Sequence, residues 1–172
     1  MLGIIALAAA PIAGVLGYAA TRPNSFRIER SATIAAPPER ILPLIEDFHR
    51  WEGWSPFEKL DPEMKKSFAG AASGRGAVYS WEGKKAGIGR MEITDISPQR
   101  VTIKLDFEKP FKASNTAEFI LQPAGAGTNV TWAMHGSQPF INKLMGVFIN
   151  LDKLVGKDFD TGLAGLKALA ER

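Results

Sequence analysis

The clearest amphipathic strand of this chain is Val101-Thr102-Ile103-Lys104-Leu105-Asp106-Phe107-Glu108, in which apolar and polar side chains alternate without exception. Successive side chains of a strand point to opposite faces of its sheet, so the pattern predicts one buried and one solvated face. Related patterns occur on both sides of it, and we expect further strands near residues 26–34, 77–82, 88–96, 117–121 and 130–134. Together these segments predict one run of antiparallel strands.

A single long helix is expected to close the chain, over about residues 139–170. Apolar residues recur there with helical spacing, at Ile141, Leu144, Met145, Phe148, Leu151, Val155, Phe159, Leu163 and Leu166. One face is therefore apolar over about eight turns of 3.6 residues each. Such a helix needs a broad packing partner, and only the sheet offers one. We therefore predict an α+β fold in which a curved antiparallel sheet wraps around a long C-terminal helix.

A shorter helix is expected after the first strand. It should begin at Ala36-Pro37-Pro38-Glu39, because proline is well tolerated in a first helical turn. Ile41, Leu44, Ile45 and Phe48 then form one apolar stripe, and Pro43 should kink or shorten the helix. The stripe ends at an aromatic loop, Trp51-Glu52-Gly53-Trp54-Ser55-Pro56.

Composition indicates one ordinary globular domain. The 172 residues are 45% hydrophobic and 23% charged, with a net charge of +3. The cations are interleaved with acidic residues, and nucleic-acid binding is not expected because backbone neutralisation needs concentrated positive charge. The chain has no cysteine, which excludes disulfides, thiolate catalysis and Cys-ligated metals.

The N-terminal stretch, residues 1–21, has no charged side chain. As a helix its apolar part would be about 30 Å long, which matches a bilayer core. We expect a transmembrane anchor or uncleaved signal here, and hence a single-pass membrane protein with the membrane as a partner. A cleaved signal peptide is the alternative, because Gly17-Tyr18-Ala19 offers a small-x-small site. Arg22, Arg27 and Arg30 favour the cytoplasmic side only weakly, so the side of the membrane is left open.

No catalytic constellation is found along the chain. There is no nucleophile elbow, dinucleotide fingerprint, P-loop or metalloprotease motif. The two histidines, His49 and His135, are both expected to be exposed, and neither a metal nor a cofactor is expected. A strand carboxylate facing the cavity would have a raised pKa and could act as an acid or base. Glu82, Asp106 and Glu118 are instead expected on the outer face, and the side of Glu92 is left open because both sets of residues on its strand include apolar ones. An enzyme is therefore the less favoured interpretation.

Several segments resemble one known superfamily. They are Phe26–Ser31 with Ile34–Glu39, then Trp51–Phe57, Gly74–Gly83 and Thr128–Trp132, followed by the C-terminal helix. Residues 25–171 thus resemble the SRPBCC superfamily, which covers polyketide cyclase/dehydrase, START-related and birch-pollen-allergen-like proteins. The resemblance implies a helix-grip fold in the order β-α-α-β-β-β-β-β-β-α, with a hydrophobic cavity between sheet and C-terminal helix. It implies no particular reaction, because the superfamily includes carriers, cyclases and chaperone activators.

Large side chains on the expected inner faces are the candidate ligand-binding residues. They are Trp54, Tyr79, Trp81, Met91, Phe107, Phe119, Trp132, Met134, Met145 and Phe148. Apolar linings with few polar groups suit lipid, quinone or polyketide-like ligands.

The favoured function is therefore a membrane-tethered binder or carrier of a small hydrophobic ligand. A cyclase/aromatase-type enzyme is one alternative, and a buried acid–base pair would distinguish it. A protein-interaction module like the chaperone activators is another, which an exposed apolar patch would favour.

Overall fold

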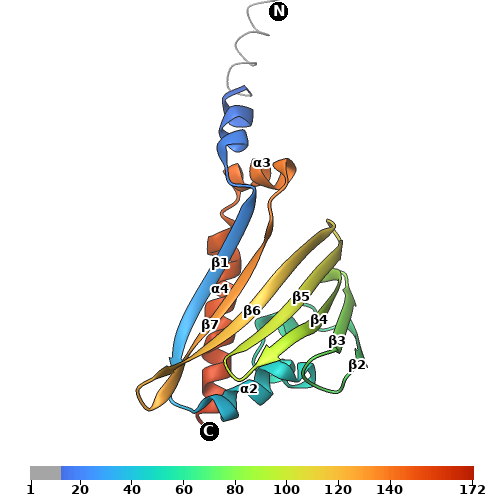
Figure 1. Cartoon of the computed structure of the whole chain (residues 1–172). Coiled ribbons are helices and arrows are strands. Elements are labelled where there is room, and N and C mark those ends of the chain that lie inside the picture. Colours follow the sequence, from blue (N-terminus) through green and yellow to red (C-terminus); the bar gives the residue numbers. More distant parts are fainter. Residues whose placement is uncertain (1–12) are drawn as a thin grey trace, which may run out of the picture.

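A computed structural model describes residues 13–172 of the chain, and one antiparallel sheet dominates it (Figure 1). Its seven strands lie in the order β1-β7-β6-β5-β4-β3-β2. Their bounds are Ser25–Ile34 for β1, Lys65–Gly70 for β2, Ala77–Gly83 for β3, Gly87–Ser97 for β4, Arg100–Lys109 for β5, Ala113–Ala124 for β6 and Gly127–Ser137 for β7.

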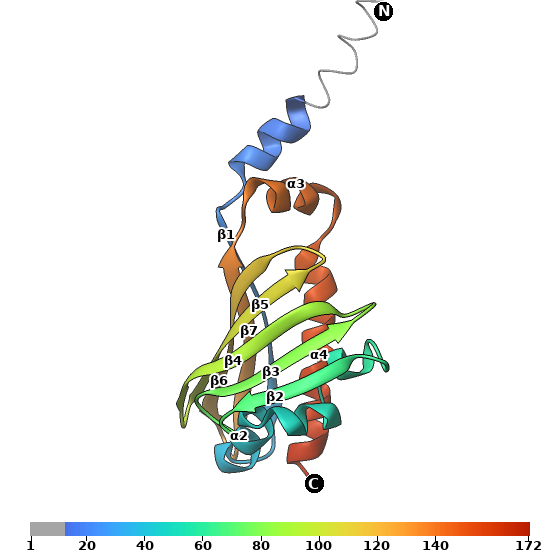
Figure 2. The ribbon, with the colours of Figure 1, turned by 90° about the vertical axis from the view of Figure 1, so that its right-hand side faces the viewer.

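Besides the helical residues 13–21, three helices and two short 3-10 helices accompany the sheet in the described part of the chain. They are α2 (Pro38–Glu46), the 3-10 helices η1 (Phe48–Gly53) and η2 (Pro56–Lys59), α3 (Phe140–Phe148) and α4 (Leu151–Ala170). The sheet curves around α4, and α2 covers one end of the space between them (Figures 1 and 2). The predicted helix-grip arrangement of antiparallel sheet and C-terminal helix is confirmed.

The alternating strand at the centre of the sheet behaves as its sequence predicts. Val101 and Ile103 are fully buried, whereas Lys104 between the inner side chains is exposed. Ile103 pairs with Ile93 of β4 on one side and with Ala117 of β6 on the other. Apolar residues of neighbouring strands therefore meet in register on the inner face, as cross-strand packing requires.

The sheet and α4 are joined by a stack of aromatic rings. Phe119 stacks on Trp132 at 4.9 Å, and Trp132 stacks on Phe159 of α4 at 4.3 Å between ring centroids. A Cβ atom at Gly162 would lie only 2.6 Å from the Trp132 ring, so α4 can approach this closely only with glycine there. Gly162 therefore has a packing role, although glycine in a helix interior costs up to about 1 kcal/mol of helix propensity relative to alanine.

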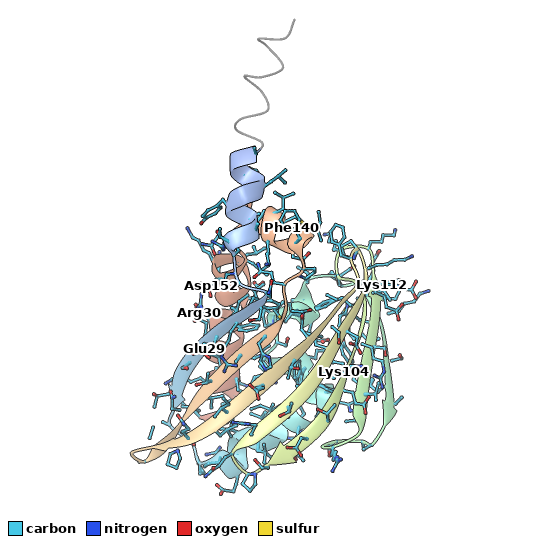
Figure 3. All side chains as sticks on the ribbon, turned by 45° about the horizontal axis from the view of Figure 1, so that its top comes forward. Glu29, Arg30, Lys104, Lys112, Phe140 and Asp152 are labelled. Atoms are coloured by element: carbon cyan, nitrogen blue, oxygen red, sulfur yellow. The ribbon has the colours of Figure 1, made fainter. Side chains whose placement is uncertain are left out.

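An ion pair also connects α4 to β1, the strand at the edge of the sheet. Arg30 of β1 donates to both carboxylate oxygens of Asp152, each at 3.1 Å. The two side chains lie beside each other where the start of α4 meets β1 (Figure 3).

The expectation of a single helix over residues 139–170 is wrong, because the structure has two helices there. The chain is extended at Ile149 and resumes as α4 with Asn150 as its N-cap. The Asn150 side chain accepts a hydrogen bond from the Lys153 backbone N–H at 2.9 Å, which satisfies one of the unpaired donors of a helix start. As a result, α3 leaves the line of α4 and caps one end of the molecule (Figure 2).

The expected membrane-spanning helix also has to be corrected. Among residues 13–172 no helix combines the length and the apolar character needed to cross a bilayer. The described part of the predicted anchor is helical over residues 13–21, about 14 Å at 1.5 Å per residue, against a hydrocarbon core of about 30 Å. The expectation of a single-pass membrane localisation rested on this helix and is wrong with it, and the membrane partner expected from the same helix has no support in the described residues. Residues 1–12 of the predicted anchor lie outside the described residues.

Candidate functional site

A mostly apolar cavity lies between the inner face of the sheet, the aromatic loop with η2, and α4. Its volume is about 250 Å³, roughly eight times the ~30 Å³ that a water molecule occupies in the liquid. Its walls are mainly aromatic and aliphatic, and Glu58 is the one charged residue among the described residues that line it. The interior is therefore not packed solid, and the space suits a small apolar molecule.

The sheet contributes one wall of this cavity through strands β3 to β7. Tyr79 of β3 pairs directly with Met91 of β4, and both side chains line the cavity. Trp81 pairs with Gly89, where an added Cβ would lie 2.3 Å from the indole ring. The missing side chain at Gly89 makes room for Trp81, whose Nε1 donates to the Ala86 carbonyl at 3.1 Å.

The aromatic loop forms the opposite wall and is held by its indole N–H groups. Trp51 donates to the Ile45 carbonyl and Trp54 to the Leu44 carbonyl, each at 2.9 Å. Both acceptors belong to α2, so the loop is fixed to the helix that precedes it. A buried indole N–H needs a hydrogen-bond partner. Because the partners here lie at the edges of the rings, the ring faces are available for packing.

The structure brings six of the ten predicted site residues to the cavity. They are Tyr79, Trp81, Met91, Phe107, Trp132 and Met134. Trp54 and Phe119 are buried beside Trp132, in the core behind the lining. Met145 and Phe148 lie on α3, outside the lining, and Phe148 is 75% exposed. The break before Asn150 explains this, because it separates α3 from the helix that packs on the sheet.

Sequence reasoning missed the charged group in the cavity wall. Glu58 of η2 has a side chain only 5% exposed, and its Oε1 accepts a hydrogen bond from the Tyr79 hydroxyl at 2.8 Å. Its Oε2 forms an ion pair with Lys66. Burial, together with the hydrogen bond and negative charge of Glu58, raises the pKa of Tyr79 above its usual range, so the phenol keeps its proton. Glu58 lies in a segment without strand or helix periodicity, so the sequence pattern gave no indication that its side chain would be buried in a cavity wall.

A second missed residue is Ser55, which is fully buried and lines the cavity. It is the N-cap residue of η2, but its hydroxyl makes no capping bond. Among residues 13–172, Ser55 Oγ is the one buried side-chain oxygen or nitrogen without a hydrogen-bond partner. Leaving a buried hydroxyl unsatisfied costs about 1–3 kcal/mol, so a packed protein usually avoids it.

The strand carboxylates and histidines lie away from the cavity. Glu92 pairs with Arg90 at 2.7 Å, Asp106 with Lys104 at 3.1 Å, and Glu118 with Arg27 at 3.4 Å, while Glu82 is exposed. His49 is exposed beside Asp47, and His135 lies 3.4 Å from Glu118. Within the described part of the chain, no group of three metal-ligating residues is arranged to hold an ion.

Large apolar side chains are exposed at the end of the molecule capped by α3. Phe140 lies there at the start of α3, and Lys112 lies at the β5–β6 turn (Figure 3). The exposed side chains of this apex are Phe111, Phe140, Ile141, Met145, Phe148, Ile149, Leu151 and Leu154.

Comparison with known proteins points to one family. Residues 25–171 match a family model described as polyketide cyclase/dehydrase and lipid transport. No curated protein matches the chain.

Solved structures of similar fold share little sequence with this chain. Protein CV1439 from Chromobacterium violaceum is 18% identical with a TM-score of 0.59, covering 88% of this chain and 99% of that one. Ara h 8.0201 is 15% identical with a TM-score of 0.53, covering 86% and 95%. The di-domain ARO/CYC StfQ from the steffimycin biosynthetic pathway is 10% identical with a TM-score of 0.63, covering 86% and 51%. At these identities the likeness shows the fold alone.

Proposed function

Because the chain belongs to the polyketide cyclase/dehydrase and lipid transport family, we propose that it binds and carries one small, largely apolar ligand in the cavity between sheet and α4. The observation that carries this proposal is the apolar space of about 250 Å³, walled by rings from both layers of the fold. Water in such a space finds few polar partners, so an apolar ligand displaces it favourably, at roughly 25 cal/mol for each Å² removed from water.

The polar groups of the wall support binding more than catalysis. An acid or base has to offer a proton or a lone pair to its substrate. The Tyr79 hydroxyl already donates to Glu58, and the second Glu58 oxygen is already paired with Lys66. Both groups are thus engaged with each other and with the protein, which suits a structural role in the wall.

A cyclase-type enzyme is the second candidate, because Glu58 and Tyr79 place a carboxylate and a phenol in the cavity wall. Catalysis would require one of them to exchange its present partner for the substrate. If the chain is such an enzyme, Tyr79→Phe abolishes turnover of a bound poly-ketone chain while leaving its affinity within a few-fold. For a carrier, no turnover is expected from either form.

A protein-interaction function would use the exposed apolar side chains of the apex instead of the cavity. The carrier is preferred because it accounts for the enclosed apolar cavity, which a protein-interaction function would leave unused. A substitution that fills the cavity distinguishes the two functions. It should abolish ligand binding but leave a protein interaction at the apex unchanged.

The test is native mass spectrometry of the full chain purified from cells, combined with organic extraction and titration with naphthalene. Ala117→Leu extends a buried lining residue into the cavity. Thr116→Leu is the matched control, because the neighbouring side chain points to the outer face of β6. Wild type and Thr116→Leu are expected to bind naphthalene, and Ala117→Leu is expected to lose most of the affinity. Equal binding by Ala117→Leu and wild type would place the ligand elsewhere.

A further inference from the structure

Backbone hydrogen bonds hold Ser55 in the cavity wall, and its hydroxyl takes no part in them. The Ser55 backbone N–H donates to the Trp51 carbonyl at 2.7 Å, and its carbonyl accepts from the Glu58 N–H at 3.4 Å. The backbone is therefore satisfied without the side chain. Serine at a helix N-cap normally folds its hydroxyl back onto the first turn, and here it does not.

Three other polar side chains of this wall have partners, whereas the indole N–H of Trp132 has no hydrogen bond within residues 13–172 but is not fully enclosed. The Trp51 and Trp81 indoles donate to backbone carbonyls, and Tyr79 donates to Glu58. Ser55 Oγ thus stands out within residues 13–172 as a fully enclosed hydroxyl with its bonding capacity unused. An unused donor–acceptor in the wall of an apolar pocket is the kind of polar group that fixes the orientation of a ligand.

The charge of the wall restricts which ligand group can occupy this position. None of the described residues that line the cavity is Lys, Arg or His. Lys66 lies next to the wall but is paired with Glu58. An ionised carboxylate on a ligand would find no cation and would meet the negative charge of Glu58, so its transfer from water is unfavourable.

We propose that Ser55 Oγ anchors a neutral oxygen, a hydroxyl or a carbonyl, on an otherwise apolar ligand, and that the cavity excludes the corresponding carboxylates. This inference rests on the proposed ligand-binding function and adds the class of ligand. The serine hydroxyl donates to a ligand carbonyl or accepts from a ligand hydroxyl, so both kinds of oxygen fit.

Three ligands that share one ring system test the proposal by isothermal titration calorimetry at pH 8 on the full chain. They are naphthalene, 2-naphthol and 2-naphthoate, which is ionised at this pH. We expect wild type to bind 2-naphthol roughly tenfold more tightly than naphthalene, the factor that corresponds to one net hydrogen bond. We expect 2-naphthoate to bind more weakly than either.

Ser55→Ala should bring the affinity for 2-naphthol down to that for naphthalene and leave naphthalene unchanged. Ser80→Ala is the matched control, because Ser80 lies in β3 beside Tyr79 and outside the lining. Thermal unfolding without ligand adds a second readout. Ser55→Ala should unfold at the same temperature as wild type or higher, since it removes an unsatisfied hydroxyl.

Two results would overturn the anchor while leaving the proposed function intact. One is equal binding of naphthalene and 2-naphthol to wild type. The other is an unchanged 2-naphthol affinity in Ser55→Ala, and a lower unfolding temperature of that variant would show in addition that the hydroxyl is structural. If wild type binds none of the three ligands, the proposed function fails with the anchor.

Discussion

The close approach of α4 to the sheet at Gly162 leads to a quantitative prediction. In Gly162→Ala the new methyl group would lie 2.6 Å from the Trp132 ring and 3.1 Å from Pro56. Neither neighbour is the end of a flexible side chain, so either α4 or the ring has to move. Overpacking of this kind costs about 1–3 kcal/mol, whereas alanine in place of glycine returns up to about 1 kcal/mol of helix propensity.

We therefore expect Gly162→Ala to lower the free energy of unfolding by about 1–2 kcal/mol. For a domain of this size that corresponds to a decrease in Tm of about 2–8 °C. The assay is thermal unfolding followed by circular dichroism, with near-ultraviolet signals reporting on Trp132. Because Trp132 lines the cavity, a displaced ring should also weaken naphthalene binding.

Gly146→Ala is the matched control for this substitution. Gly146 lies inside α3, and a Cβ there would meet its nearest neighbour at 3.7 Å, an ordinary contact. Gly146→Ala should therefore keep or raise Tm through helix propensity alone. If Gly162→Ala is as stable as wild type, the aromatic stack does not set the distance between α4 and the sheet, and the reasoning is refuted.

Four further substitutions test other parts of the account. Tyr79→Phe leaves Glu58 with one hydrogen bond fewer and should cost about 1–3 kcal/mol in urea unfolding, whereas Tyr18→Phe, at an exposed tyrosine, should cost little. Asn150→Ala removes the cap of α4 and should cost about 0.5–2 kcal/mol in the same assay; an unchanged midpoint would contradict the cap. Phe148→Ala should leave naphthalene affinity unchanged while Trp132→Ala lowers it at least tenfold, and equal losses would contradict the assigned cavity. Hydrogen bonds from Arg30 lower the pKa of Asp152 below its unfolded value near 3.9, so this pair stabilises the fold above that pH and less as the pH falls through the folded pKa. The Tm difference between wild type and Arg30→Gln should therefore be smaller at pH 2.5 than at pH 6; an equal difference would contradict the pairing.

Alternation predicted the buried face of the strands near residues 101–108, 117–121 and 130–134, but not how deep each residue lies. Ile103, Met91 and Ala117 line the cavity, whereas Val101, Ile93 and Phe119 on the same inner faces belong to the solid core. The difference depends on position along the curved sheet relative to α2, which covers only one end. Curvature arises from the whole sheet, so no single strand pattern encodes it.

Helical periodicity misled the interpretation at the C-terminus. The apolar stripe runs from Ile141 to Leu166 without a gap, although the helix breaks before Asn150. Asparagine is a preferred N-cap, and its place ahead of Leu151 and Asp152 was the signal that could have revealed the break. The break accounts for Met145 and Phe148 lying outside the cavity.

The two polar residues of the wall, Ser55 and Glu58, could not be predicted from periodicity. Both belong to a short 3-10 segment that has no repeating pattern. Their burial results from the way the aromatic loop is fixed to α2 and folded against Tyr79, contacts that join residues far apart in the chain.

The most direct measurement of the central claim uses methionine methyl groups as reporters of the cavity. Met64, Met91 and Met134 line it, whereas Met145 lies exposed on α3. With ¹³C-methyl methionine in the full chain, intermolecular nuclear Overhauser effects are expected from bound naphthalene to Met64, Met91 and Met134, and none to Met145. Contacts to Met145 alone, or a saturated complex without contacts to the other three, would contradict a ligand held between the sheet and α4.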